Sequence, residues 1–253
     1  MSRSAAVAAA RLALLAGAVL ALELLCRAGV IQPLTLIPPS AMAAALAGLL
    51  WSGELNADLI HTGGAVAASL ALAVGLGLPL GVAVHGLPRL RRALDPLLAA
   101  YYAVPTFVFY PLLVAILGLN QAPLIVLGTA FGLPAMMMAT LNGLDRVPPV
   151  LLRTARVHRL GRLDTLASIV LPSAAPFLFT GCKLALAYAV IGIIAGEFIL
   201  ADAGLGHAIS FAYDGFENRT MYAVMLLVLG LATGLNLLLH LWETRLMRRR
   251  ARA

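Results

Sequence analysis

Long apolar runs separated by short polar stretches constrain the fold of this chain more than any other feature. A run of about 20 apolar residues is long enough to cross a bilayer as one helix. In chain order the predicted spans are 12–30, 62–87, the second part of 93–119, 123–144, 173–200 and 220–242. Charged residues make up 11% of the chain, against about 25% in soluble domains. We therefore predict an all-α polytopic membrane protein with about six transmembrane helices.

Prolines divide two regions between these spans. Asp95-Pro96, Pro105 and Pro111 predict that 93–119 begins as a broken helix and only then spans the membrane. Between the first two spans, Pro38 and Pro39 precede a modest helix over 40–51, for which Ser40 is the expected N-cap. That helix is too short to span, so we expect it to lie on the outer membrane surface.

The expected organisation has three parts. Residues 1–59 form the N-terminal span and the interfacial helix, and 60–245 form a transmembrane domain that contains the polar loop 145–171. Residues 246–253 form a basic tail.

Arginines are distributed unequally between the two sides that six spans would create. With both termini on one side, that side holds fifteen arginines and the other holds Arg27 and Arg219. Loops rich in basic residues remain in the cytoplasm during insertion. We therefore expect a multi-pass membrane protein with both termini and the loop 145–171 in the cytoplasm. Nucleic acid is not an expected partner, since the arginines flank apolar runs instead of forming one basic face.

The stretch 153–172 is the longest polar interruption of the apolar sequence. It mixes four arginines, a histidine and a single acid, Asp164, with several leucines. A membrane span could not carry so many arginines, and a solvated loop would not need so many leucines. We expect a short helix, a turn at Gly161 and a second helix that meet another protein on the membrane face. The alternative is that the arginines serve only as a topology signal.

The same stretch resembles the cytoplasmic loop of the permease subunits of binding-protein-dependent ABC importers. The pattern of that loop is E-A-A-x-x-x-G, then nine residues, then I-x-L-P. Counted back from Leu171-Pro172 without gaps, Arg153-Thr154-Ala155 falls on E-A-A and Arg159 falls on the glycine. One alanine, the leucine-proline end and the spacing match, whereas the glutamate and the glycine do not. The resemblance implies that an ATPase-coupling loop includes Arg153, Thr154, Ala155, Arg159, Leu160, Gly161 and Pro172.

Four further segments resemble the nitrate, sulfonate and taurine group of these permeases, to which thiamine-precursor and riboflavin permeases are similar. They are SLALAVGLGLPLGVAVHG (69–86), LDPLLAAYYAVPTFVFYPLL (94–113), LPSAAPFLFTGCKLALAYAVIGIIAGEF (171–198) and AGLGHAI (203–209). The resemblance implies a type I ABC importer permease fold and a path for a small organic or anionic solute. It also implies three kinds of partner: a periplasmic binding protein, two copies of an ATP-binding subunit, and a second copy of this chain.

No sequence of the form G-x-x-x-x-G-K-[ST] occurs, and the only lysine, Lys183, is followed by Leu184. The chain therefore cannot bind ATP through a P-loop, and we expect it to be a transport subunit, without a cofactor, that borrows a separate ATPase. A self-contained secondary transporter is the alternative. Such a protein usually shows paired repeats and ionisable groups at the membrane midplane. A membrane enzyme would need clustered acids, histidines or a nucleophile near one face.

Glu197, near the outer end of the span 173–200, is the leading candidate for a pathway or gate residue. Acids inside a membrane are costly and are usually placed for function; the alternative is a carboxylate that reaches the interface. Tyr110, Thr129 and Asn142 could line a path, with helix packing as their alternative role. The five histidines are far apart and have no metal-ligand spacing, so we expect no metal site.

Overall fold

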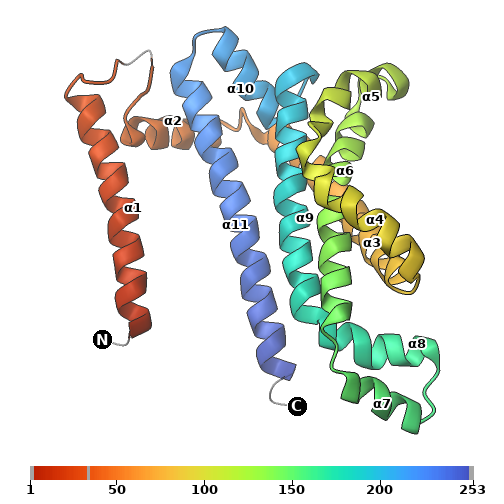
Figure 1. The fold of residues 1–253 in the computed structure, drawn as a ribbon. Coiled ribbons are helices and arrows are strands. Elements are labelled where there is room, and N and C mark those ends of the chain that lie inside the picture. The colour runs from red at the N-terminus through yellow and green to blue at the C-terminus, as the bar shows by residue number, and fades with distance from the viewer. Residues whose placement is uncertain (1–2, 33–34, 251–253) are drawn as a thin grey trace.

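The computed structural model describes residues 3–32 and 35–250, which form helices and no strand. Figure 1 shows their arrangement. The α-helices are α1 (Arg3–Arg27), α2 (Pro39–Ser52), α3 (Asn56–His85), α4 (Pro88–Ala100), α5 (Tyr110–Leu117), α6 (Gln121–Asp145), α7 (Pro149–Val157), α8 (Arg162–Thr165), α9 (Leu171–Leu200), α10 (Leu205–Asp214) and α11 (Asn218–Arg250). Two short 3₁₀ helices, η1 (Tyr101–Ala103) and η2 (Thr106–Phe109), and one π-helical segment, η3 (Leu166–Val170), complete the set. The all-α class is confirmed.

Five helical segments of the described residues are long and apolar enough to cross a membrane. They are Ala9–Arg27, Asn56–His85, Gln121–Asp145, Arg162–Leu200 and Asn218–Arg245. These segments match five of the six predicted spans. The sixth, 93–119, is divided among α4, η1, η2 and α5, in agreement with the broken helix that its prolines predict.

The divided segment nevertheless runs the full length of the bundle. The starts of α3 and α6 lie together, because Gln121 donates a hydrogen bond to the carbonyl of His61 (3.5 Å). Their ends also lie together, because His85 Nε2 is 3.3 Å from Asp145 Oδ1. The two helices are therefore parallel, and the chain between them must return from the end of α3 to the start of α6. Residues 88–120 thus complete a sixth crossing of the bundle.

Three helices, α3, α6 and α9, form the packed core, and small residues allow their close approach. A Cβ atom on Gly81 of α3 would lie 2.7 Å from Thr140 Cβ of α6. One on Gly132 of α6 would lie 2.9 Å from the carbonyl oxygen of Ala185 on α9. Contacts this short would push the helices apart, so small residues set the spacing of the core.

The other two long helices, α1 and α11, lie to one side of this core (Figure 1). Figure 1 shows α1 standing apart, with both termini at the same end of the molecule as α7 and α8. We call this the α7 end, and the opposite end, which carries α2 and α10, the α10 end. The last helix extends to Arg250, so it continues beyond the predicted span end at 242 into the predicted tail; residues 251–253 lie outside the described part.

The predicted N-cap role of Ser40 is wrong. Helix α2 begins at Pro39 after Pro38, which places Ser40 inside the first turn. Its N–H donates to Glu23 Oε2 (3.0 Å) and its hydroxyl to Glu23 Oε1 (2.6 Å). A carboxylate from α1 thus satisfies a free N–H of the first turn of α2, where negative charge is favourable.

Candidate functional site

The loop 145–171 lies at the α7 end and has the predicted helix–turn–helix form; we call it the coupling loop after the role that the family resemblance predicts. Two prolines, 148 and 149, begin α7, because proline fits the first helical position. The helix closes with hydrogen bonds from the His158 N–H to the Thr154 carbonyl and from the Leu160 N–H to the Ala155 carbonyl, both 3.0 Å. The chain then enters α8, which continues without interruption through η3 into α9.

The surface of this loop is both basic and apolar. The predicted contact residues Arg153, Thr154, Arg159, Leu160 and Gly161 are all exposed. Among the apolar neighbours, Val157 and Leu163 each expose 80% of their surface. The exception is Ala155, which is 2% exposed on the inner side of α7. Exposed apolar and cationic groups side by side are typical of a surface that contacts another protein.

Gly161 lies in the segment between α7 and α8, as predicted, but it is not the left-handed residue of the turn. Gly161 has φ −64° and ψ 164°, an extended conformation that any residue adopts. The left-handed residue of the turn is Arg159, with φ +51°. Its position in the Leu160-to-Ala155 hydrogen-bonded ring is the one where helices usually place a glycine.

Pro172 lies in the first turn of α9 and does not end the helix. The N–H that proline lacks would have bonded a carbonyl of the preceding turn, and η3 at that point is π-helical. Figure 1 shows the chain turning there from α8, which lies across the α7 end, into the upright α9. Proline and a π-helical segment are recognised causes of such a bend.

A polar cluster beside the loop joins three helices and was missed by sequence analysis. Arg91 of α4 donates two hydrogen bonds to the two carboxylate oxygens of Asp145, the longer of 2.7 Å, and His85 of α3 approaches the same group. Asp145 ends α6 four residues before α7 begins, so the cluster fixes the base of the coupling loop. Nothing in the linear spacing of these residues indicates their contact.

At the α10 end, Glu197 of α9 is enclosed by protein. Its side chain is 0% exposed, so it does not reach an interface as the alternative role required. The Thr62 hydroxyl donates to its oxygens at 2.8 and 2.9 Å, and the N–H of Gly206 donates to Oε2 at 2.9 Å. His61 Nδ1 lies 3.5 Å from Oε1. The carboxylate thus joins α9 to the start of α3 and to the turn Gly204-Leu205-Gly206, at which α10 begins.

Two more hydrogen bonds hold the same turn against α3. The N–H of Leu205 donates to Thr62 Oγ1 (2.9 Å), and the N–H of Gly204 donates to Asp58 Oδ1 (2.8 Å). Asp58, His61 and Thr62 follow an i, i+3, i+4 spacing, which places them on one face of α3. That spacing is the sequence signal that could have identified the partners of Glu197.

The glycines of this turn are required by its geometry. Gly204 has φ +106°, a conformation that side chains rarely adopt, and a Cβ there would overlap the Glu197 carboxyl group. A Cβ on Gly206 would overlap the carbonyl oxygen of Ile194 and lie 2.6 Å from Glu197 Cβ. The segment Gly204-Leu205-Gly206 therefore packs directly on the last turns of α9.

Comparison with known proteins places these features in a family. The family model described as "Binding-protein-dependent transport system inner membrane component" matches residues 73–252. The chain belongs to this family. It is 28% identical to the nitrate import permease protein of Leptolyngbya laminosa over 181 residues, which are 72% of this chain and 63% of that relative. It is 28% identical to the taurine transport system permease protein of Escherichia coli over 226 residues, 85% of this chain and 80% of that one.

The fold also matches a solved member of the ABC importers. An inward-facing structure of the MetNI methionine ABC transporter aligns with a TM-score of 0.66 at 21% sequence identity, over 80% of this chain and 97% of the aligned chain. The predicted importer-permease fold is thereby confirmed. As a permease-family protein, the chain is a transport component and not an enzyme.

In this permease-family chain the left-handed turn residue coincides with a family position. Arg159 is the residue that falls on the glycine of the coupling-loop pattern, and it adopts the backbone conformation that favours glycine. Ala155, which falls on the second alanine of the pattern, is the buried residue of α7. Where the pattern has glycine, this chain therefore holds a charged side chain on a left-handed backbone.

The three other pathway candidates lie in different environments. Tyr110 is 2% exposed and packs against Leu124 and Leu127. Thr129 is half-buried, and its hydroxyl donates to the Ile125 carbonyl of its own helix (2.7 Å). Asn142, near the α7 end of α6, is exposed. Tyr110 lies beside the end of α9 that carries Glu197, since a Cβ atom on the neighbouring Gly196 would be 3.6 Å from Tyr110 Cε2. Asn142 lies at the opposite end of the bundle from Glu197.

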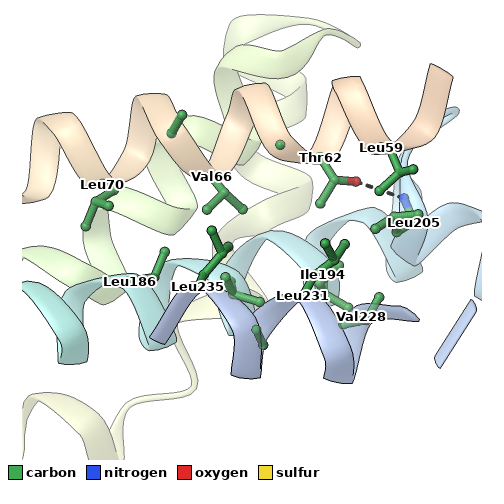
Figure 2. Close-up of a pocket in the computed structure, with 14 residues that line it drawn as sticks. Leu59, Thr62, Val66, Leu70, Leu186, Ile194, Leu205, Val228, Leu231 and Leu235 are labelled. Atoms are coloured by element: carbon green, nitrogen blue, oxygen red, sulfur yellow. Dashed lines mark hydrogen bonds between the residues drawn. The ribbon is translucent and has the colours of Figure 1, made fainter. Parts of the chain in front are cut away.

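An apolar cavity of about 330 Å³ lies between α3, α9 and α11. Figure 2 shows leucine, isoleucine and valine side chains from the three helices pointing into it, with Thr62 at one end bonded to the Leu205 N–H. The Thr62 hydroxyl already donates to Glu197, so its hydrogen-bonding capacity is used within the protein. In the part of the chain that the structure describes, no group of three or more His, Cys, Asp or Glu side chains could hold a metal ion.

Proposed function

We propose that this chain is the transmembrane subunit of a binding-protein-dependent ABC importer and forms the path for a small organic or anionic solute. The observation that carries the proposal is the coupling loop: a basic and apolar helix–turn–helix surface on a chain that belongs to this permease family. A separate ATP-binding subunit supplies the energy through this loop. A periplasmic binding protein delivers the solute to the α10 end.

The names of the relatives support the solute class. They include permeases for nitrate, taurine and bicarbonate, which are small and carry an anionic group. Family membership favours the importer over a self-contained secondary transporter, because an importer permease depends on a separate ATPase and this sequence has no P-loop.

We further propose that the α7 end faces the cytoplasm of a bacterial inner membrane. Both termini and the coupling loop lie at that end. The fifteen arginines that sequence analysis assigns to one side all belong to the terminal segments, the start of α4 and the loop 145–171. This asymmetry is the signature of a cytoplasmic side.

The assembly proposed is a homodimer of this chain with two ATP-binding subunits, because the chain holds one permease unit and no fused repeat. Tyr110, Thr129 and Asn142 are proposed to line the path between the two copies. The exposed side chain of Asn142 is directly available for this role. Mass measurement of the purified complex tests the copy numbers: two copies of this chain are expected, and a complex with one copy and a different permease contradicts the homodimer.

The chemistry of the coupling loop indicates the complementary surface on the ATPase. Arginine occupies the position where the family pattern has glutamate, so the groove that receives it should carry acidic residues. Arg153→Glu or Arg159→Glu would then place like charges together, at a cost of several kcal/mol where the contact is desolvated. Each variant should lose the ATPase during purification and lose transport, while the permease still inserts into the membrane.

Arg89→Glu is the matched control for these two variants. Arg89 is an exposed arginine at the same end of the molecule, on α4 and outside the coupling loop. The control should retain the ATPase. If the control also loses the ATPase, the effect of the variants is a general effect of charge. If the Arg153 and Arg159 variants transport normally, the arginines of the loop serve only as a topology signal.

A further inference from the structure

One uninterrupted helical segment connects the coupling loop with the buried carboxylate at the opposite end. Residues Arg162–Leu200 form 39 consecutive helical residues through α8, η3 and α9. At 1.5 Å per residue the path is about 60 Å long. One end of this segment follows the turn at Arg159, and the other end carries Glu197 in its last turn.

Glu197 holds two other segments to the end of this helix. Its partners are Thr62 on α3 and the N–H of Gly206 at the start of α10, and Thr62 in turn accepts a hydrogen bond from the N–H of Leu205. All of these hydrogen bonds are buried. Breaking them would leave a buried carboxylate and buried N–H groups without partners, which is costly.

The packing around the two glycines leaves the turn no room to shift. The backbone at Gly204 lies against the Glu197 carboxyl group, and the backbone at Gly206 lies against Ile194 and the Glu197 Cβ. Any displacement of the last turn of α9 must therefore carry the turn and α10 with it. The Glu197 carboxylate is also 0% exposed, so a solute could reach it only after these hydrogen bonds open.

We propose that Glu197 is a positioning residue that locks α9, the start of α3 and α10 into one rigid unit. A displacement of the coupling loop then reaches the surface of the α10 end through α9. This inference rests on the proposed function for the existence of an ATPase that moves the loop. It assigns to Glu197 a mechanical role in place of a role in lining the path.

The test measures whether nucleotide binding at one end changes the other end. Tyr213 on α10 is 62% exposed and serves as the reporter position. Tyr213→Cys is introduced into the full chain with Cys26→Ala and Cys182→Ala, purified with its associated ATPase and placed in lipid nanodiscs. The rate of labelling by a membrane-impermeant maleimide is measured without nucleotide and with ATP and vanadate. A several-fold difference between the two conditions is expected.

Two substitutions break the lock, and two serve as controls. Thr62→Val and Glu197→Gln remove hydrogen bonds of the lock and should leave labelling at position 213 the same in both conditions, while the ATPase stays bound and hydrolyses ATP. Thr62→Ser keeps the hydroxyl and should restore the nucleotide response. Thr140→Val is the matched control, since Thr140 is equally buried but its hydroxyl bonds only the Met136 carbonyl of its own helix; it should respond like the parent.

Each outcome decides between the two proposals. If Thr62→Val and Glu197→Gln keep the nucleotide response of the parent, the lock does not transmit movement and the inference is wrong. If the parent binds an ATPase but shows no response at position 213, the inference is also wrong and the proposed function stands. If the parent binds no ATPase, the proposed function is wrong, and the inference that rests on it is wrong as well. Should one lock variant not fold, the other still gives the comparison.

Discussion

Replacing Arg159 by glycine should stabilise the isolated permease. Arg159 adopts φ +51°, and the left-handed conformation costs a residue with a Cβ about 1–2 kcal/mol relative to the right-handed one. Glycine has no Cβ and adopts the left-handed conformation without this steric cost. Because the side chain is exposed, its removal sacrifices little packing. We therefore expect the free energy of unfolding of Arg159→Gly to rise by about 1 kcal/mol.

Thermal unfolding of the purified chain in detergent measures the effect. A gain of about 1 kcal/mol corresponds to a rise in Tm of about 2–4 °C for a chain of this size. Arg159→Ala is the control, because it removes the same charge but keeps the Cβ and should not raise Tm. Equal shifts for the two variants would show that charge, and not backbone conformation, limits the turn. Gly161→Pro, at φ −64°, should be tolerated, since proline prefers this φ value.

Three further predictions concern other parts of the molecule. Leu163→Cys, at a position 80% exposed in the coupling loop, should resist impermeant maleimide in intact cells and react in inverted membranes; reaction from outside would reverse the proposed orientation. Lys183 of α9 and Glu243 of α11 form an ion pair of 2.6 Å. Lys183→Met should therefore lower the free energy of unfolding by about 3 kcal/mol, and adding Glu243→Met should recover most of that loss. Additive effects of the two replacements would contradict the pairing. Asp145→Asn should weaken the contact with Arg91 by about 1 kcal/mol or less and lower transport more than stability; unchanged transport would show that the cluster does not position the loop.

The spans were predictable because each depends on local composition. The predicted spans 123–144 and 173–200 differ from α6 and α9 by only a few residues, since a long apolar run must form a helix in a bilayer. The mixture of arginines and leucines around Gly161 likewise predicted the helix–turn–helix form of the coupling loop. These features need no knowledge of which helices touch.

The details that failed depend on contacts between distant segments or on backbone geometry. Ser40 follows two prolines, as a cap residue often does, but the group that satisfies α2 is Glu23, seventeen residues earlier on another helix. Gly161 was assigned the turn because glycine favours turns, whereas the exact ring of hydrogen bonds that closes α7 places the left-handed residue at Arg159. The lock at Glu197 required the antiparallel packing of α3 against α9, which brings the start of α3 to the end of α9 and which the spacing of the α3 residues does not reveal by itself.

The strain at Arg159 connects the stability of the permease with its proposed function. Glycine would adopt the backbone conformation of Arg159 with less strain. Strained residues persist where another interaction compensates their strain energy, and they are common at functional sites. Because the guanidinium group is exposed, it can compensate the strain energy of the backbone only by contact with a partner. An acidic groove on the ATPase would supply that contact. Arg159→Gly should therefore raise the Tm of the isolated chain and lower the retention of the ATPase at the same time. Opposite signs in the two measurements would separate a docking residue from a topology signal, because a residue that acted only during membrane insertion would leave ATPase retention unchanged.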